Sequence, residues 1–268
     1  MVGHDPDVRR WWSQRQGCDP TLDQSGALEG PCGWPVRSAP VSKDPDGKTK
    51  KGSHHSVAAT RLVLVRHAVT AQTGPVLSGR SPGIDLSEDG IAQAVVVGAR
   101  LANAQIAAVY SSPIERTLQT ARHIAGHHGL EVRVLDGVLE ADYGEWTGKK
   151  IVDLVKSDVW KTVQVAPSRA RFPGGETLAG MQARMVAALE DVVSQHAGET
   201  IIVVSHADPI KAAVAHFTGT HLDLFQRIMI SPASVTVFEL GKFGAVLVTC
   251  NSISDLAEIL PAKTAKAE

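Results

Sequence analysis

The sequence lacks the features that would anchor a protein in a membrane or cross-link it covalently. No stretch approaches the roughly 20 consecutive apolar residues that a membrane-spanning helix needs. The N-terminus opens with charged residues, from Asp5 to Arg10, and has no apolar core of the kind found in secretory signals. Only three cysteines are present, and their spacing fits neither a metal site nor a disulfide framework: Cys18, Cys32 and Cys250. We therefore expect a cytoplasmic protein.

An excess of charge of either sign is also lacking. The 268 residues include 27 Lys and Arg against 28 Asp and Glu, which gives a formal net charge of -1 at pH 7. Such a chain has no general attraction for nucleic acid or for an anionic membrane surface, so we expect neither as a partner. Any anion must then be bound at a local site. The composition leaves the oligomeric state open, and a homo-oligomer is compatible with it.

Residues 1–59 lack regular hydrophobic periodicity. Six prolines interrupt this segment: Pro6, Pro20, Pro31, Pro35, Pro40 and Pro45. Such a composition buries too little apolar surface to offset an ordering entropy of ~1–2 kcal/mol per residue. We expect a disordered N-terminal extension over 1–59. The alternative is that three tryptophans dock on the following domain: Trp11, Trp12 and Trp34.

The pattern becomes regular from Thr60, and we expect one folded domain over 60–256 with a frayed tail over 257–268. Short apolar runs predict strands at 62–65, 107–110, 131–135 and 201–204. Helical periodicity predicts helices that begin at Ser87 and that span 114–127, 178–196 and 209–217. Segments 234–240 and 245–249 predict a hairpin. This alternation indicates an α/β fold, a three-layer α/β/α sandwich with a mostly parallel central sheet.

For the helix that begins at Ser87, the hydroxyl of this serine is a candidate N-cap. The spacing of the apolar side chains predicts that Ile91, Ala94, Val95 and Leu101 form its buried face.

Basic and polar side chains follow three of the predicted strands. Arg66 and His67 follow the first, Arg116 lies just beyond the second, and His206 follows the strand at 201–204. Ligands of α/β sheets bind at the carboxyl ends of the strands, so these side chains should converge. Guanidinium groups match phosphate oxygens in shape and stay charged at any working pH. One arginine-histidine pair alone is a weak signal, whereas two arginines and two histidines distributed over three strand ends favour an anion site.

The motifs that carry these residues resemble the histidine phosphatase superfamily, which is phosphoglycerate-mutase-like. They are Arg66-His67 with Thr70, Ser78-Gly79-Arg80, Ser111-Ser112-Pro113 with Arg116, Gln119-Thr120-Ala121, Glu140, and Ser205-His206. The resemblance covers Arg61 to about residue 256. It implies a phosphoglycerate-mutase-like fold and a phosphatase that hydrolyses phosphate monoesters, a histidine acid-type enzyme whose substrate is a small phosphorylated metabolite.

The resemblance also implies roles for individual residues. His67 is the expected nucleophile, which becomes phosphorylated during turnover, and Glu140 is the expected acid for the leaving oxygen. Arg66, Arg116 and His206 would stabilise the charge on the transferred phosphoryl group. The other expected phosphate or substrate contacts are Thr73, Arg80 and Ala207. No cofactor and no metal ion are expected.

Several positions depart from the family pattern. Ala68 and Val69 replace a common glycine and glutamate, and Thr73 replaces an asparagine that commonly helps to bind phosphate. Ala207 and Asp208 follow the second histidine, where small neutral residues are usual. Asp208 would repel phosphate unless it faces His206 or a helix N-terminus. These departures leave the physiological substrate undetermined.

Two alternatives to a phosphatase remain open. A phosphoglycerate-type mutase carries a long insertion that encloses the substrate. In this sequence, only residues 149–173 lie between Trp146-Thr147-Gly148, at the end of the segment that contains Glu140, and Gly174-Gly175-Glu176-Thr177. A phosphate-binding module with little catalysis would account for Thr73 and Asp208. Arg169 and Arg171 would either contact the substrate or be solvated.

Overall fold

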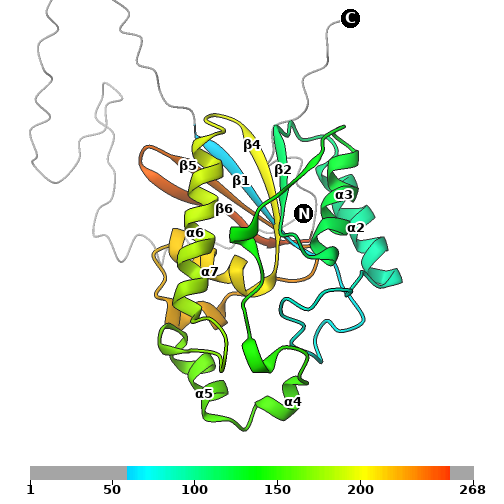
Figure 1. The fold of residues 1–268 in the computed structure, drawn as a ribbon. Coiled ribbons are helices and arrows are strands. Elements are labelled where there is room, and N and C mark those ends of the chain that lie inside the picture. Colours follow the sequence, from blue (N-terminus) through cyan, green and yellow to red (C-terminus); the bar gives the residue numbers. More distant parts are fainter. Residues whose placement is uncertain (1–58, 254–268) are drawn as a thin grey trace, which may run out of the picture. The chain divides into compact units, whose positions relative to one another are not determined.

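The computed structural model describes residues 59–253, so the predicted tail at 257–268 and, apart from Ala59, the predicted extension at 1–59 lie outside it. Its centre is a six-stranded sheet with the order β3-β2-β4-β1-β5-β6 (Figure 1). The strands are β1 (Thr60–Arg66), β2 (Ala108–Ser111), β3 (Val132–Val134), β4 (Thr200–Ser205), β5 (Val235–Gly241) and β6 (Gly244–Ser252). The first four are mutually parallel, and β5 and β6 are antiparallel additions. The predicted strands and the hairpin are confirmed.

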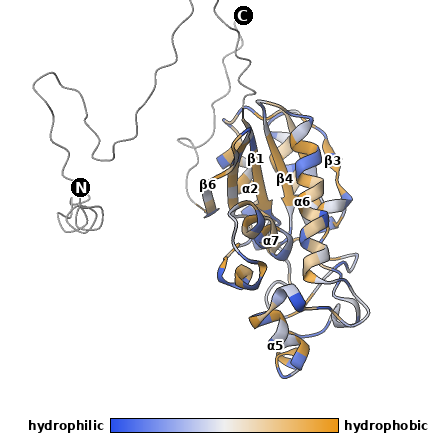
Figure 2. Ribbon diagram, turned by 90° about the vertical axis from the view of Figure 1, so that its left-hand side faces the viewer, coloured by the Kyte–Doolittle hydropathy of each residue, from blue (hydrophilic) through white to orange (hydrophobic). Residues whose placement is uncertain are grey.

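Helices cover both faces of the sheet, which confirms the predicted three layers (Figure 1). Helices α2 (Glu88–Leu101) and α3 (Glu115–Gly126) pack on one face. Helices α6 (Leu178–Ser194) and α7 (Ala207–Phe217) pack on the other. Figure 2 shows the resulting hydrophobic colour along the central strands.

The central strand β1 explains why both faces must be covered. Its side chains alternate between the two layers: Val63 and Val65 join the cluster beneath α2 and α3, and Leu62 and Leu64 join the cluster beneath α6 and α7. All four are fully buried. A strand buried on both faces is a continuous apolar run, which is the pattern that the sequence shows.

The buried face of α2 matches the predicted one only in part: Ala94 and Leu101 are fully buried, as predicted. The Ser87 side chain accepts a hydrogen bond from the Gly90 N–H and caps the helix as predicted. Ile91 and Val95, however, are each 48% exposed. The helix turns two glycines inward instead: a Cβ on Gly90 would lie 2.0 Å from the carbonyl oxygen of Val69, and a Cβ on Gly98 would lie 2.8 Å from the carbonyl oxygen of His123 in α3. Apolar periodicity does not count glycine, so it wrongly placed Ile91 and Val95 on the buried face and missed Gly90 and Gly98.

A third cluster lies beyond the carboxyl ends of the parallel strands. It includes the short helices α4 (Ile151–Leu154) and α5 (Asp158–Val165), seen below the sheet in Figure 1. The 3-10 turns of this region are η2 (Gly144–Trp146), η3 (Pro167–Arg169) and η4 (Leu222–Arg227). The remaining turn, η1 (Asp136–Val138), packs with the cluster beneath α6 and α7. Gly144 has a φ of 54°, and a Cβ there would lie 2.2 Å from the Pro173 carbonyl oxygen, so only glycine fits.

Within residues 59–253, no helix has the length and apolar character that crossing a membrane requires.

Candidate active site

The three predicted strand ends converge on one cavity of about 420 Å³. Strands β1 and β4 are neighbours, with Arg66 opposite Ser205, so the residues that follow them meet. The rings of His67 and His206 pack edge to face, with centroids 5.3 Å apart. Arg66, His67 and Arg116 line the cavity, and His206 lies directly behind them.

The environment of His67 fixes its protonation. Its Nδ1 lies 2.7 Å from the backbone carbonyl oxygen of Ala68, which only accepts, so Nδ1 carries the proton and donates. Burial lowers the pKa of His67 well below its ordinary value, and Arg116 and Arg66 lower it further. The imidazole is therefore neutral, and its lone pair is on Nε2.

His206 is held as the opposite tautomer. Arg116 Nη2 only donates, so His206 Nδ1, 3.2 Å away, accepts. The proton is then on Nε2, which donates to the Ser112 hydroxyl at 2.9 Å. Burial lowers the pKa of His206 well below its usual value, followed by the charge of Arg116. This neutral ring orients Arg116.

Arg66 and Arg116 each use only some of their guanidinium hydrogen-bond donors within the protein. Arg66 Nη1 donates to the Ile230 carbonyl oxygen at 2.7 Å, and Arg116 Nη2 donates to the Gly79 carbonyl oxygen at 2.7 Å. Within the described part of the chain, Arg66 Nε and Arg116 Nε and Nη1 are buried without a partner. An unpaired buried donor costs about 1–3 kcal/mol, and more when it is charged. Three such donors beside a cavity fit an anion with several oxygens.

The α3 residues of the motif position this arrangement. The Thr120 hydroxyl accepts from the Ala68 N–H at 3.1 Å and donates to the Arg116 carbonyl oxygen at 2.8 Å. It thereby ties the loop after β1 to the helix that carries Arg116. The Gln119 side chain accepts from the Leu86 N–H at 2.8 Å and fixes the approach to α2.

Glu140 lies in the same cavity as a buried carboxyl group. Burial raises its pKa to about 7, the nearby Asp208 raises it as well, and Arg116 and Arg66 oppose this rise. One carboxyl oxygen, Oε1, accepts from the Ala141 N–H at 2.9 Å. A carboxyl group with a pKa near neutrality can both give and take a proton at physiological pH.

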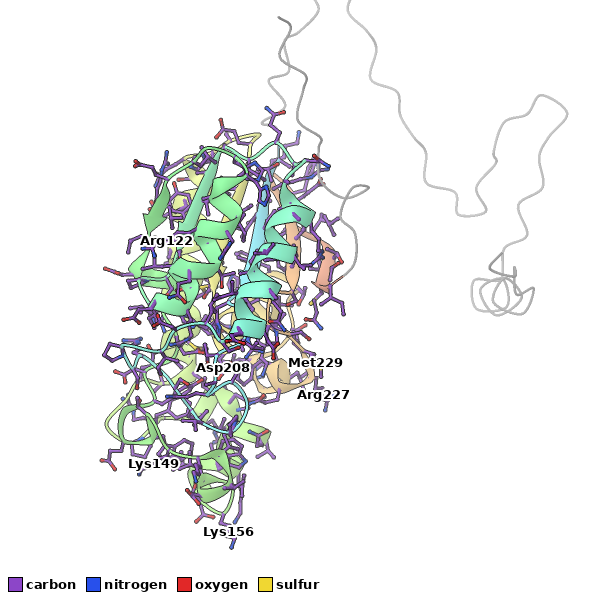
Figure 3. All side chains as sticks on the ribbon, turned by 90° about the vertical axis from the view of Figure 1, so that its right-hand side faces the viewer. Arg122, Lys149, Lys156, Asp208, Arg227 and Met229 are labelled. Atoms are coloured by element: carbon purple, nitrogen blue, oxygen red, sulfur yellow. The ribbon has the colours of Figure 1, made fainter. Side chains whose placement is uncertain are left out.

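Asp208 lies in the first turn of α7, at the helix N-terminus where a carboxylate is favoured. Its Oδ2 accepts from the Tyr143 hydroxyl at 2.9 Å, and its Oδ1 lies 3.5 Å from Lys211 Nζ. Figure 3 shows Asp208 at the junction between the sheet and the α4–α5 region. Of the two placements that would reduce its repulsion of phosphate, Asp208 has the helix N-terminus, and its contacts with Tyr143 and Lys211 reduce this repulsion further.

Of the other predicted contacts, the structure brings Thr73 and Ala207 to the cavity and leaves Arg80 outside its lining. Arg80 Nε donates to the Glu140 carbonyl oxygen at 2.9 Å, and Arg80 Nη2 pairs with Glu176 at 3.1 Å. Arg80 thus has its guanidinium bound to these neighbours, and its predicted phosphate contact stays a prediction. The Thr73 hydroxyl accepts from the Thr70 N–H at 2.9 Å.

The sequence patterns missed Arg184. This α6 residue donates to the Glu140 carbonyl oxygen at 2.9 Å and to Glu176 Oε1 at 2.7 Å. Together with Arg80 it fixes the backbone that presents the Glu140 side chain. In the sequence, an arginine that holds the backbone of a site looks the same as an arginine exposed to solvent on an amphipathic helix.

The segment at 149–173 contributes more to the cavity than its length indicated. Ile151, Trp160, Val163 and Gln164 all line the cavity. Arg169 and Arg171 are exposed and do not line it. Among residues 59–253, no group of three or more His, Cys, Asp or Glu is placed to hold a metal ion.

Comparisons with known proteins agree with this geometry. The family model "Histidine phosphatase superfamily (branch 1)" matches residues 62–253. Phosphoserine phosphatase 1 of Hydrogenobacter thermophilus is 34% identical over 204 residues, which cover 74% of this chain and 95% of that protein. A probable phosphoglycerate mutase of Yersinia pestis is 29% identical over 179 residues, 66% of this chain and 83% of that one.

Among solved structures, a phosphoserine phosphatase of Entamoeba histolytica, crystallised with 3-phosphoglyceric acid, superposes with a TM-score of 0.66 at 27% identity. The match covers 73% of this chain and 98% of that one. These similarities confirm the predicted phosphoglycerate-mutase-like fold. The chain therefore belongs to branch 1 of the histidine phosphatase superfamily, a family of phosphatases and related phosphomutases.

Proposed function

We propose that this protein hydrolyses small phosphate monoesters through a phosphohistidine intermediate on His67, without a metal ion. The observation that carries the proposal is the placement of a neutral His67, with its lone pair on Nε2, beside arginines that hold three unpaired buried donors. These groups supply a nucleophile and a receptor for the equatorial oxygens at one point.

In the first step, His67 Nε2 attacks phosphorus, and the bond between phosphorus and the ester oxygen breaks. The electron pair of that bond goes to the leaving oxygen, which takes a proton from Glu140. An alkoxide is a poor leaving group, so this proton matters for alkyl esters. Arg66 and Arg116 stabilise the charge on the equatorial oxygens.

In the second step, a water molecule attacks phosphorus of the phosphohistidine. The Glu140 carboxylate takes a proton from the water as the bond from nitrogen to phosphorus breaks and its electron pair returns to Nε2. Inorganic phosphate leaves, and both His67 and Glu140 are restored. A pKa of about 7 suits Glu140 to both directions of proton transfer.

The physiological substrate is proposed to be a small phosphorylated metabolite of the cytoplasm. The cavity of about 420 Å³ supports a substrate of this size. The similarity to phosphoserine phosphatase 1 and to the Entamoeba histolytica enzyme supports phosphate hydrolysis and makes phosphoserine and 3-phosphoglycerate the first compounds to test.

The direct test is to trap the intermediate. The protein is mixed with excess phosphoserine or 4-nitrophenyl phosphate, quenched in denaturant at alkaline pH, and analysed by mass spectrometry. We expect one phosphoryl group on His67 in the wild type and none in His67→Ala. Substrate turnover without a phosphorylated histidine would contradict the mechanism. Inactivity towards a broad panel of phosphate monoesters would favour the phosphate-binding module instead.

The alternative of a phosphoglycerate mutase has one supporting observation, since the segment at 149–173 forms part of the cavity wall. A mutase must shield the phosphohistidine from water and return the phosphoryl group to the product. We expect phosphate release and little interconversion of 2- and 3-phosphoglycerate, because this segment is short. Interconversion faster than phosphate release would establish the mutase.

A further inference from the structure

Lys211 is a cation of the cavity that the proposed phosphoryl transfer does not use. It lies in α7, one turn beyond Asp208, and only 18% of its side chain is exposed. Its Nζ lies 3.2 Å from the Gln226 side-chain oxygen and 5.4 Å from the centroid of the Phe225 ring. Both Lys211 and Gln226 line the cavity.

This cation comes from different elements than the phosphate receptor. Arg66 ends β1 and Arg116 lies in α3, whereas Lys211 and Gln226 come from α7 and η4. Among the cavity-lining residues that the structure describes, the cations are these two arginines and Lys211. Much of the remaining wall is apolar or aromatic: Val76, Leu77, Trp146, Ile151, Trp160, Val163 and Phe172.

The ion pair between Lys211 and Asp208 leaves the ammonium incompletely neutralised. Its separation of 3.5 Å is at the outer limit of a hydrogen bond. The other Asp208 oxygen, Oδ2, is engaged by the Tyr143 hydroxyl at 2.9 Å. Burial raises the pKa of Tyr143 well above its usual range, so this hydroxyl keeps its proton and continues to donate.

We propose that Lys211 and Gln226 form a subsite for a carboxylate on the alcohol portion of the substrate. The inference rests on the proposed phosphatase function and specifies its substrate class as phosphate monoesters of hydroxy acids or hydroxy amino acids. A carboxylate would accept from the Lys211 ammonium and from the Gln226 amide nitrogen, whose oxygen already faces the lysine. One lysine and one neutral amide suit a monoanion better than a second phosphate dianion, because Asp208 repels a dianion more strongly than a monoanion.

Two pairs of substrates isolate the carboxylate. 3-Phosphoglycerate and glycerol 3-phosphate differ only in whether a carboxylate or a hydroxymethyl group is present. Phosphoserine and phosphoethanolamine differ only in whether a carboxylate or a hydrogen is present. The values of kcat/KM are measured for all four and for 4-nitrophenyl phosphate. The proteins compared are wild type, Lys211→Met, Lys211→Arg and Lys156→Met. Lys156 is an exposed control that Figure 3 shows well away from Asp208.

We expect the wild type to prefer the carboxylated member of each pair. In Lys211→Met, kcat/KM for these members falls roughly 10- to 100-fold, mainly through KM, and falls much less for their partners. Lys211→Arg keeps most of the preference, and Lys156→Met behaves as wild type. Melting temperatures and turnover of 4-nitrophenyl phosphate show whether each variant is folded.

An equal loss on all substrates would assign Lys211 a structural role, and a preference unchanged in Lys211→Met would remove it from recognition. Either result refutes the subsite while the proposed function stands. A wild type that hydrolyses none of these compounds would instead refute the proposed function and the subsite together.

Discussion

His67 and His206 lie edge to face at the ends of two paired strands, at an interplanar angle of 62°, and are held as opposite tautomers. The Ala68 carbonyl oxygen keeps the proton of His67 on Nδ1, and Arg116 keeps that of His206 on Nε2. One ring therefore presents a lone pair at Nε2, while the other uses its lone pair to orient a guanidinium. The two histidines have different roles because different neighbours fix their tautomers.

Replacing the nucleophile should abolish activity without unfolding the protein. In His67→Ala, we expect phosphate release from 4-nitrophenyl phosphate to fall to well below about a tenth of wild type, because the other histidine of the site, His206, directs its lone pair at Arg116. His123→Ala, on α3 and away from the cavity lining, is the matched control. Residual activity above that level in a protein with a wild-type melting temperature would show that His67 is not the nucleophile.

Removing the acid should affect substrates unequally. Glu140→Gln cannot protonate the leaving oxygen, so hydrolysis of alkyl esters such as phosphoserine should slow by roughly 10²–10⁴-fold. Aryl phosphates have better leaving groups and should slow much less in a single turnover. Rapid-quench measurements of the first step on both substrates provide the check, with Glu145→Gln as the control because Glu145 is exposed. Equal slowing would remove Glu140 from the role of acid.

The pH dependence should report the pKa of Glu140. This carboxyl group must be protonated for the first step, so kcat/KM for phosphoserine should fall as the pH rises through about 7. Asp208 raises the pKa of Glu140, while Arg116 and Arg66 oppose it. In Asp208→Asn the fall should therefore begin at a lower pH. Profiles measured over roughly pH 5–9 test this, and a midpoint that is unchanged or higher in the variant would contradict it.

Arg80 and Arg116 should differ in how they affect phosphate binding. Inorganic phosphate is a competitive inhibitor in the proposed mechanism, and its inhibition constant measures how tightly the arginine site binds phosphate. We expect Arg116→Met to weaken it by at least about tenfold, because charged hydrogen bonds to the oxygens are lost. Arg80→Met should weaken it only slightly and should lower kcat, since Arg80 holds the Glu140 backbone. If both variants weakened phosphate inhibition equally, Arg80 would be a phosphate-binding residue.

Chelation should leave the activity unchanged. The proposed mechanism uses guanidinium groups where other phosphoryl-transfer enzymes use magnesium. We expect the same kcat and KM before and after exhaustive dialysis against excess EDTA. A loss of activity that magnesium, manganese or zinc restores would contradict a mechanism based on arginine alone.

Patterns in the amino-acid sequence were enough to predict the fold class and the central residues of the site. Buried parallel strands are continuous apolar runs, and the carboxyl ends of such strands meet at one edge, so Arg66, His67, Arg116 and His206 were predictable as a group. The apolar runs are local patterns in the chain, and the convergence of the strand ends follows from the parallel topology that those runs predict.

Other properties were decided only by the tertiary structure. The inward face of α2 depends on how closely Gly90 and Gly98 approach their neighbours, and the position of Arg80 depends on contacts with Glu140 and Glu176. Protonation states depend on burial and on charges from distant segments. No linear pattern encodes these quantities, because each is set by distances between residues far apart in the chain.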